Sequence, residues 1–187
     1  MTTLQEKYKK EAIPGMIKIF GYKNVMAVPS IKKVVINSSF GKNVAGKAAG
    51  EREKIQNAVT QDLSSIAGQK TKIIKSKKSI AGFKLREGLE IAAMVTLRKG
   101  KMWDFLERLI YLSLPRSHDF KGIDTKSIDK RGNLNIGFKE HIFFPEIFTE
   151  KEKTIFGLEI TVVTNAKSKE EGLELYKLLG FPIREIK

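Results

Sequence analysis

Residues 69–101 read QKTKIIKSKKSIAGFKLREGLEIAAMVTLRKGK, and the pattern of this stretch decides the fold. It predicts two strands joined by a loop at 76–82, and the second strand, 90–98, alternates regularly between two faces. The residues expected on one face are Ile91, Ala93, Val95 and Leu97, and those on the other are Ala92, Met94, Thr96 and Arg98. One side of this strand is therefore expected to pack on a core and the other to remain open.

The same stretch carries much of the positive charge of the chain. It holds ten Lys or Arg residues against two Glu, a net charge of +8 out of +14 for all 187 residues. Basic residues interleaved with a strand pattern favour a polyanionic partner, because Lys and Arg release counterions from nucleic-acid phosphates. The other interpretations of a Lys-rich run are a solvated face or a sorting signal. Nucleic acid is the favoured partner, because a small, apolar tip at 80–83 directly follows the lysines and allows close approach to a backbone.

Composition limits the remaining possibilities. A chain of 187 residues with 41% hydrophobic and 30% charged residues predicts one globular domain over 1–187, with an irregular excursion at about 115–153. The absence of cysteine excludes disulfides and thiolate metal sites. The N-terminus lacks an apolar signal region, and no apolar run approaches the ~20 residues of a membrane span. We therefore expect a cytoplasmic protein with no membrane partner.

Helices and strands alternate along the rest of the chain. Helices are predicted at 3–20, 51–67, 101–114 and 168–180, and further strands at 31–38, 134–139 and 155–164. Pro14 is expected to kink or divide the first helix and Pro115 to end the third, while Ser168 and Glu171 form a capping box for the last. The predicted fold class is α+β, a mostly antiparallel sheet with helices packed on one face and the other face open for RNA.

The strand at 31–38 also separates two kinds of side chain. Its alternation places Val34 and Ile36 on one face and Lys33, Val35 and Asn37 on the other. The polar residues of this strand are therefore expected on the open side of the sheet.

The segment GKNVAGKA at 41–48 has the spacing of a phosphate-binding P-loop, between a predicted strand and a predicted helix. However, Ala48 lacks the hydroxyl that binds Mg²⁺, and no strand ends in the aspartate that a nucleotide hydrolase needs. A basic loop is the favoured interpretation, and a P-loop nucleotide-binding enzyme is the alternative. Lys47→Ala would separate the two, because it would abolish enzyme activity but only slightly weaken RNA binding.

No other pattern indicates chemistry. The two histidines, His118 and His141, lie in the irregular region without metal-ligand spacing, so we expect them to be solvated surface residues. No serine lies in a Gly-x-Ser-x-Gly turn. The sequence therefore predicts a protein that is not an enzyme, with no catalytic residue, no metal site and no cofactor.

Six longer blocks carry a resemblance to a known family. They are KSKKSIAGFKLREG (75–88), VTLRKGKMWDFLERLI (95–110), LPRSHDFKG (114–122), DKRGN (129–133), FFPEI (143–147) and TNAKSKEEGLELYKLLGFP (164–182). In this order they resemble the L-five family of bacterial large-subunit ribosomal proteins, and the resemblance extends over essentially the whole chain. It implies a structural component of the large ribosomal subunit with a sheet covered by helices on one side. A free RNA chaperone of the same fold is a further alternative.

The resemblance also implies partners and the residues that meet them. The implied partners are 5S rRNA in the central protuberance, 23S-type rRNA, P-site tRNA, neighbouring large-subunit proteins and, through an intersubunit bridge, a small-subunit head protein. The implied 5S rRNA contacts are Asn37, Gln69, Thr96, Lys33, Lys70 and Arg98. The implied tRNA contacts are Lys75, Lys77, Lys78, Ser79, Ile80, Ala81, Gly82 and Phe83. The implied bridge residues are Glu146, Glu150 and Glu152. The implied location is a bacterial-type ribosome, in the cytoplasm or in an organelle.

The chain departs from the family pattern at three places. Ala92 and Met94 stand where the family has Gly and a Lys or Cys, and His118 and Lys121 replace arginines. The loop at 41–50 is longer and more basic than in typical members, and we interpret it as a source of extra RNA contacts.

Overall fold

The computed structural model describes residues 3–117, 120–147 and 155–184. The chain divides into two compact units, one formed by 1–34, 97–136 and 161–187 (unit 1) and one by 35–96 and 137–160 (unit 2). That 1–187 acts as one domain stays a prediction.

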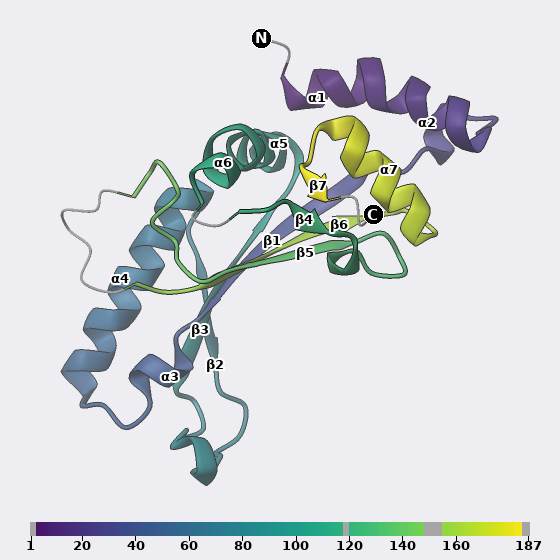
Figure 1. Cartoon of the computed structure of the whole chain (residues 1–187). Helices are drawn as coiled ribbons and strands as arrows, with labels where there is room; N and C mark the ends of the chain where they lie inside the picture. Colours follow the sequence, from purple (N-terminus) through teal and green to yellow (C-terminus); the bar gives the residue numbers. More distant parts are fainter. Residues whose placement is uncertain (1–2, 118–119, 148–154, 185–187) are drawn as a thin grey trace. The chain divides into compact units, whose positions relative to one another are not determined.

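The order of elements agrees with the predicted fold class (Figure 1). The helices are α1 (Leu4–Lys7), α2 (Ile13–Phe20), α3 (Gly41–Val44), α4 (Ala49–Ala67), α5 (Lys99–Arg108), α6 (Leu114–Arg116) and α7 (Lys169–Leu179). The strands are β1 (Ile31–Ser39), β2 (Lys72–Lys75), β3 (Glu90–Leu97), β4 (Ile123–Asp124), β5 (Leu134–Phe138), β6 (Leu158–Thr164) and β7 (Ile183–Arg184). Five strands form an antiparallel sheet in the order β2-β3-β1-β6-β5, and β4 pairs in parallel with β7. The α+β prediction is confirmed.

Most predicted elements begin or end within three residues of the observed ones, but the connection between β2 and β3 was predicted too short. It runs over 76–89, instead of 76–82, because the residues after the tip fold back beside those before it. The backbone N–H of Ile80 donates to Leu85 O at 3.0 Å, and that of Ser76 donates to Leu89 O at 2.7 Å.

Two prolines of unit 1 are accommodated by π-helical turns, Tyr8–Ala12 before Pro14 and Leu109–Ser113 before Pro115. At the end of each turn a backbone N–H donates to the carbonyl five residues earlier, from Ile13 to Tyr8 and from Leu114 to Leu109. The wider turn relieves the clash between a proline ring and the carbonyl four residues back. The helical run from Leu4 to Phe20 is therefore continuous, and the predicted kink or division at Pro14 takes the form of this wider turn. The prediction that a helix ends before Pro115 is wrong.

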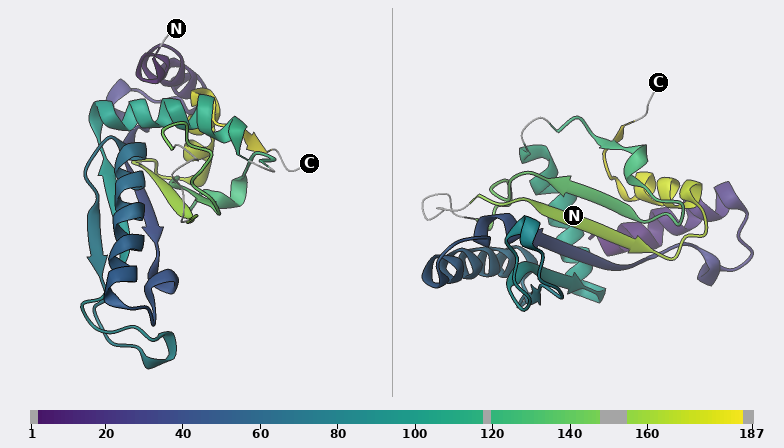
Figure 2. Two further views of the ribbon diagram at one scale, coloured as in Figure 1. Left: turned by 90° about the vertical axis from the view of Figure 1, so that its left-hand side faces the viewer. Right: turned by 90° about the horizontal axis from the view of Figure 1, so that it is seen from below.

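The core of unit 2 follows the predicted periodicities except at the start of β3. There Ala92, predicted on the open face, is buried and Ile91, predicted on the core face, is half-buried. Val59, Leu63 and Ile66 of α4 are fully buried, as are Ile36 of β1 and Ala93 of β3. Figure 2 shows α4 running along these strands. Gly68 ends the helix in the left-handed conformation (φ 60°), which glycine adopts without strain.

A buried histidine in unit 2 corrects one prediction. His141 is 0% exposed and stacks on Phe156, with ring centroids 3.7 Å apart. Its Nδ1 accepts from the Phe156 backbone N–H at 3.4 Å, and its Nε2 lies 3.6 Å from Asp62 Oδ2 on α4. The expectation of a solvated His141 is therefore wrong, because polar partners and an aromatic ring compensate its burial. His118 lies outside the described residues.

In unit 1, the turn at 129–133 lies directly against α7. A Cβ built on Gly172 would lie 2.5 Å from Gly132 Cα, and one built on Gly132 would lie 2.7 Å from Ala166 Cβ. The Tyr176 hydroxyl lies 3.0 Å from Gly132 O and 3.2 Å from Val162 O of β6. Burial, followed by the charge of Asp129, raises the pKa of Tyr176, so the phenol stays protonated and donates. Two glycines and one tyrosine thus hold this turn between α7 and β6.

The ends of α7 confirm the predicted caps. Ser168 Oγ accepts from the Glu171 backbone N–H at 3.3 Å, while Glu171 Oε2 accepts from the Lys167 N–H at 2.8 Å. The carboxylate thus reaches one residue further back than in the usual capping box, in which it meets the N-cap residue itself. Gly180 ends the helix with a φ of 93°.

Asp129 gives unit 1 a predicted pH dependence. Burial alone would raise the pKa of Asp129, but hydrogen bonds from the Asn133 side chain and from the Asn133 and Arg131 backbone N–H groups outweigh it and lower the pKa. A carboxyl whose folded pKa is depressed stabilises the fold above its unfolded pKa of about 3.9, and this contribution is lost as the pH falls through the folded value. Unfolding of Asp129→Asn, followed by denaturant between about pH 2 and 6, should depend less on pH than that of the parent chain. An equally flat profile for Glu11→Gln, an exposed acid of the same unit, would contradict this assignment.

Candidate nucleic-acid interface

In unit 2, the face of β1, β2 and β3 opposite their buried residues carries polar and basic side chains. Three half-buried residues on this face alternate along their strands with buried ones. They are Asn37 of β1 and Met94 and Thr96 of β3. The β2–β3 pairing sets Lys72 opposite Met94, and directly opposite residues of antiparallel strands share a face. Amide, hydroxyl and ammonium groups therefore line this side, which we call the open face.

Asn37 has an unmet hydrogen-bonding capacity on the open face. Within the described parts of the chain, its Oδ1 is buried and has no hydrogen-bond partner. Leaving a buried acceptor unpaired costs about 1–3 kcal/mol, so such groups in a folded chain call for an explanation. A ligand that supplies a donor after a small rotation of the amide would remove this cost.

Two more of the predicted 5S rRNA contacts lie beside Thr96. The side-chain amide of Gln69 donates to the Thr96 carbonyl at 3.4 Å, and Gln69 and Lys70 are both exposed. The left-handed Gly68 turns the chain from α4 toward β2 at this point. The structure therefore brings Gln69 to Thr96, on the strand next to that of Asn37.

Lys33 and Arg98, the other two predicted contacts, belong to unit 1. Lys33 is a half-buried residue of β1 that alternates with the buried Val34, as predicted. Arg98 is exposed and precedes the first residue of α5.

The predicted tRNA-contacting segment, 75–83, forms the outer part of a hydrogen-bonded loop. Ala81–Phe83 is a 3₁₀ turn at the tip, and Ile80 and Phe83 are 45% and 70% exposed. Lys77 and Lys78 are exposed, whereas Lys75 pairs with Glu90 at 3.4 Å. The tip thus presents cations and an aromatic ring on a backbone held by its own hydrogen bonds.

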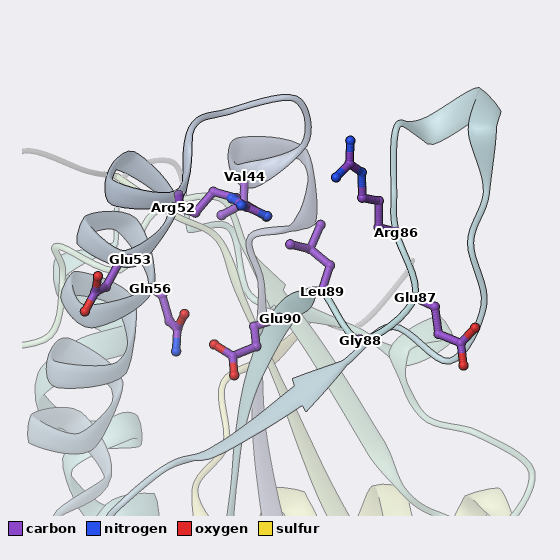
Figure 3. A pocket seen from close by; sticks show the side chains of 10 residues that line it. Val44, Arg52, Glu53, Gln56, Arg86, Glu87, Gly88, Leu89 and Glu90 are labelled. Carbon is purple, nitrogen blue, oxygen red and sulfur yellow. The ribbon is translucent and has the colours of Figure 1, made fainter.

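The sequence alone did not assign a function to Arg52, Lys84 or Arg86, which the structure gathers with Lys47 around one hollow. In Figure 3, Arg52 points from α4 toward Val44 and Leu89, and Arg86 stands on the loop across from it. The continuation of the basic run after the tip, at Lys84 and Arg86, was the available signal. Arg52 gave none, because a cation in the first turns of a predicted helix is usually only a solvated residue.

The P-loop alternative does not fit the structure of 41–48. A P-loop wraps a phosphate with successive backbone N–H groups, whereas Gly41–Val44 here forms the helical turn α3, and Val44 is buried. The N–H groups of Asn43 and Val44 donate to Phe40 O at 2.9 and 3.2 Å, so they are not available to a nucleotide.

Of the predicted bridge residues, Glu146 is half-buried in unit 2, and Glu150 and Glu152 lie outside the described residues. Within the described ranges, no group of three or more His, Cys, Asp or Glu side chains is arranged to hold a metal ion. None of the described helices combines the length and the apolar character of a membrane span.

Comparisons with known proteins agree with the resemblance noted in the sequence. Residues 24–86 match the model of the family described as ribosomal protein L5, and 90–183 match the model of the C-terminus of the same ribosomal family. The chain is 50% identical over 184 residues to the large ribosomal subunit protein uL5 of Geobacter sulfurreducens, covering 98% of this chain and 99% of the relative. It is 48% identical over 184 residues to uL5 of Desulforapulum autotrophicum, with the same coverage. It is 47% identical over 185 residues to uL5 of Halothermothrix orenii, and this match covers 99% of this chain and 100% of the relative.

These matches extend over nearly the full length of the chain and of its relatives. They remove the nucleotide-hydrolysing alternative, because the family is a structural and non-enzymatic component of the ribosome. The chain belongs to the ribosomal protein L5 family of the large ribosomal subunit, where its partners are rRNA and other ribosomal proteins.

Proposed function

We propose that the chain anchors 5S rRNA in the large subunit through the open face of unit 2. The observation that carries this proposal is the unpaired Asn37 Oδ1 on β1, the strand next to that of Thr96, which Gln69 contacts. RNA helices offer 2′-hydroxyl groups and phosphates across a wide, shallow minor groove, and these groups pair with amides, hydroxyls and ammonium groups. Lys70 and Lys72 supply the charge that such a surface needs.

We propose a second contact, between the tip of the β2–β3 loop and P-site tRNA. Lys77 and Lys78 are exposed there beside the exposed ring of Phe83. Lysines hold phosphates without reading sequence, which suits a surface that must accept tRNAs of every sequence.

The proposed bridge to a small-subunit head protein would use the segment around Glu146. Acidic residues at this position would suit a basic partner, because complementary charge steers association and fixes register. Glu150 and Glu152 are proposed as part of the same surface on their sequence alone.

Asn37→Ala and Thr96→Ala together should weaken 5S rRNA binding roughly tenfold, since each lost hydrogen bond is worth about 0.5–1.5 kcal/mol. The free chain should be no less stable with Asn37→Ala, because that change removes an unpaired buried group. Binding of the full chain to 5S rRNA, with tRNA and a scrambled hairpin as competitors, measures the first effect, and denaturant unfolding measures the second.

The matched control is Asn57→Ala, the same change at an exposed position of α4. Its 5S rRNA affinity should equal that of the parent chain. Equal losses from Asn37→Ala and Asn57→Ala, or equal affinity of the parent chain for all three RNAs, would contradict the proposal.

A further inference from the structure

A concave basic surface lies next to the tip of the β2–β3 loop, within unit 2. It is a hollow of about 420 Å³ between 44–47, the first turns of α4 and the loop residues 79–89. Its charged lining residues are Lys47, Arg52, Lys84 and Arg86, and none of the described carboxylates lines it. An adjoining hollow of about 350 Å³ shares Arg52 and Arg86, and Figure 3 shows these two arginines on opposite walls.

Among the described residues, the carboxylates near these cations, Glu53, Glu87 and Glu90, line the adjoining hollow and not this one. In the described residues, none of its four cations is in an ion pair, and the buried Nε of Arg52 has no hydrogen-bond partner. A buried guanidinium N–H without an acceptor is costly, and like charges around one cavity repel each other more strongly where protein replaces water. Both costs would disappear if an anion with several acceptor oxygens entered.

The backbone around the hollow places one of its lysines in an unusual conformation. Lys84 has a φ of 51°, in the left-handed region that residues other than glycine rarely adopt. Its N–H donates to Ala81 O at 3.0 Å, and a Cβ built on Gly46 would lie 3.7 Å from Lys84 Cδ. The chain thus holds Lys84 against the loop that carries Lys47, and such strain is concentrated at functional sites.

We propose that this hollow binds a phosphate of an RNA backbone, a contact additional to the open face that rests on the proposed RNA-binding function. Arginine presents a planar fork of donors that matches phosphate oxygens, and Arg52 and Arg86 offer two such forks across one cavity. Among the described residues no aromatic side chain lines the hollow to stack on a base, and position 48 is Ala. The hollow therefore suits a backbone phosphate better than a nucleotide held by its base.

The two RNAs of the proposed function are the possible sources of this phosphate, and a salt series distinguishes them. The experiment measures the affinity of the full chain as a function of salt concentration, once for 5S rRNA and once for tRNA. The proteins compared are the parent, Arg52→Gln, Arg86→Gln and the double variant. Each phosphate contact contributes about 0.7–0.9 to the slope of log affinity against log salt. For the RNA that enters the hollow, the slope of the double variant should become shallower by about this amount and its affinity should fall roughly tenfold.

The matched control is Lys54→Gln, which removes one charge from an exposed position of the same helix that does not line the hollow. It should leave both slopes unchanged. Lys84→Gly is a second test, because glycine accepts a φ of 51° without strain. This variant should keep or raise the midpoint of thermal unfolding of the free chain. It should also weaken binding of the RNA that enters the hollow.

The outcomes separate this inference from the proposed function. A shallower slope for either RNA supports the hollow as a phosphate site and names its source, even if Asn37→Ala has no effect and the 5S assignment fails. Unchanged slopes for both RNAs in the double variant would overturn the inference, whatever Asn37→Ala does. Binding of ATP to the parent chain more tightly than RNA, and its loss in Arg52→Gln, would overturn it as well.

Discussion

Replacing Gly172 with alanine is expected to lower the free energy of unfolding by about 3 kcal/mol, because overpacking at a site that cannot move costs this much. The added Cβ would lie 2.5 Å from Gly132 Cα and 2.8 Å from Gly132 O, both of them backbone atoms. A flexible side chain could rotate away from such a contact, but backbone has to shift as a whole. The shift would also disturb the Gly132 carbonyl that meets the Tyr176 hydroxyl.

Gly100→Ala is the matched control, since both positions are helical glycines of unit 1. Apart from its chain neighbours and the backbone of its own helix, no described atom lies within 4 Å of a Cβ at Gly100. This change should therefore not lower stability, and near the start of a helix it should raise it by at most about 0.5 kcal/mol. Denaturant unfolding of both variants gives the comparison. Equal stability of the two would mean that the close approach of the 129–133 turn to α7 does not constrain the fold.

Replacing His141 with alanine is the second change with a large expected effect, about 3 kcal/mol of lost stability. The imidazole is fully buried, stacks on Phe156 and accepts from the Phe156 N–H. Its loss leaves a cavity and also removes the acceptor of a buried backbone N–H, and the two costs add.

His141→Phe separates packing from hydrogen bonding at this position. Phenylalanine keeps a ring against Phe156 but cannot accept from its N–H, so a loss of about 1–2 kcal/mol is expected, between the parent and His141→Ala. Unfolding in denaturant measures all three. Equal stability of His141→Ala and the parent, as expected for a solvated histidine, would contradict a structural role of the buried imidazole.

Strand faces and helix ends were predictable because short-range patterns determine them. The alternation of 31–38 and 90–98 placed Asn37 and Thr96 correctly, because successive side chains of a strand point to opposite faces of the sheet. It placed Ala92 wrongly, since this residue is buried beside Ala93. Ser168 and Gly180 bound α7 for equally local reasons.

Features that depend on distant residues were not predictable. His141 is buried because Asp62 and Phe156 come to it in space, and no pattern near His141 encodes them. The sequence predicts the end of a helix at Pro115, because a proline in an ordinary α-helix clashes with the preceding turn, and no pattern in the sequence signals the π-helical turn that accommodates it. The basic hollow combines Arg52 with Arg86, which only the β2–β3 pairing and the packing of α4 bring together.

Photo-crosslinking from the open face tests most directly whether this surface binds 5S rRNA. The photo-reactive residue p-benzoylphenylalanine replaces either Met94, which is half-buried on β3, or Asn57, which is exposed on α4. Each full-length variant is then irradiated with 5S rRNA. We expect crosslinks to 5S rRNA from position 94, few from position 57, and loss of the former when Asn37→Ala is added. Crosslinks of equal yield from both positions, or stronger ones from position 57, would contradict an RNA-binding open face.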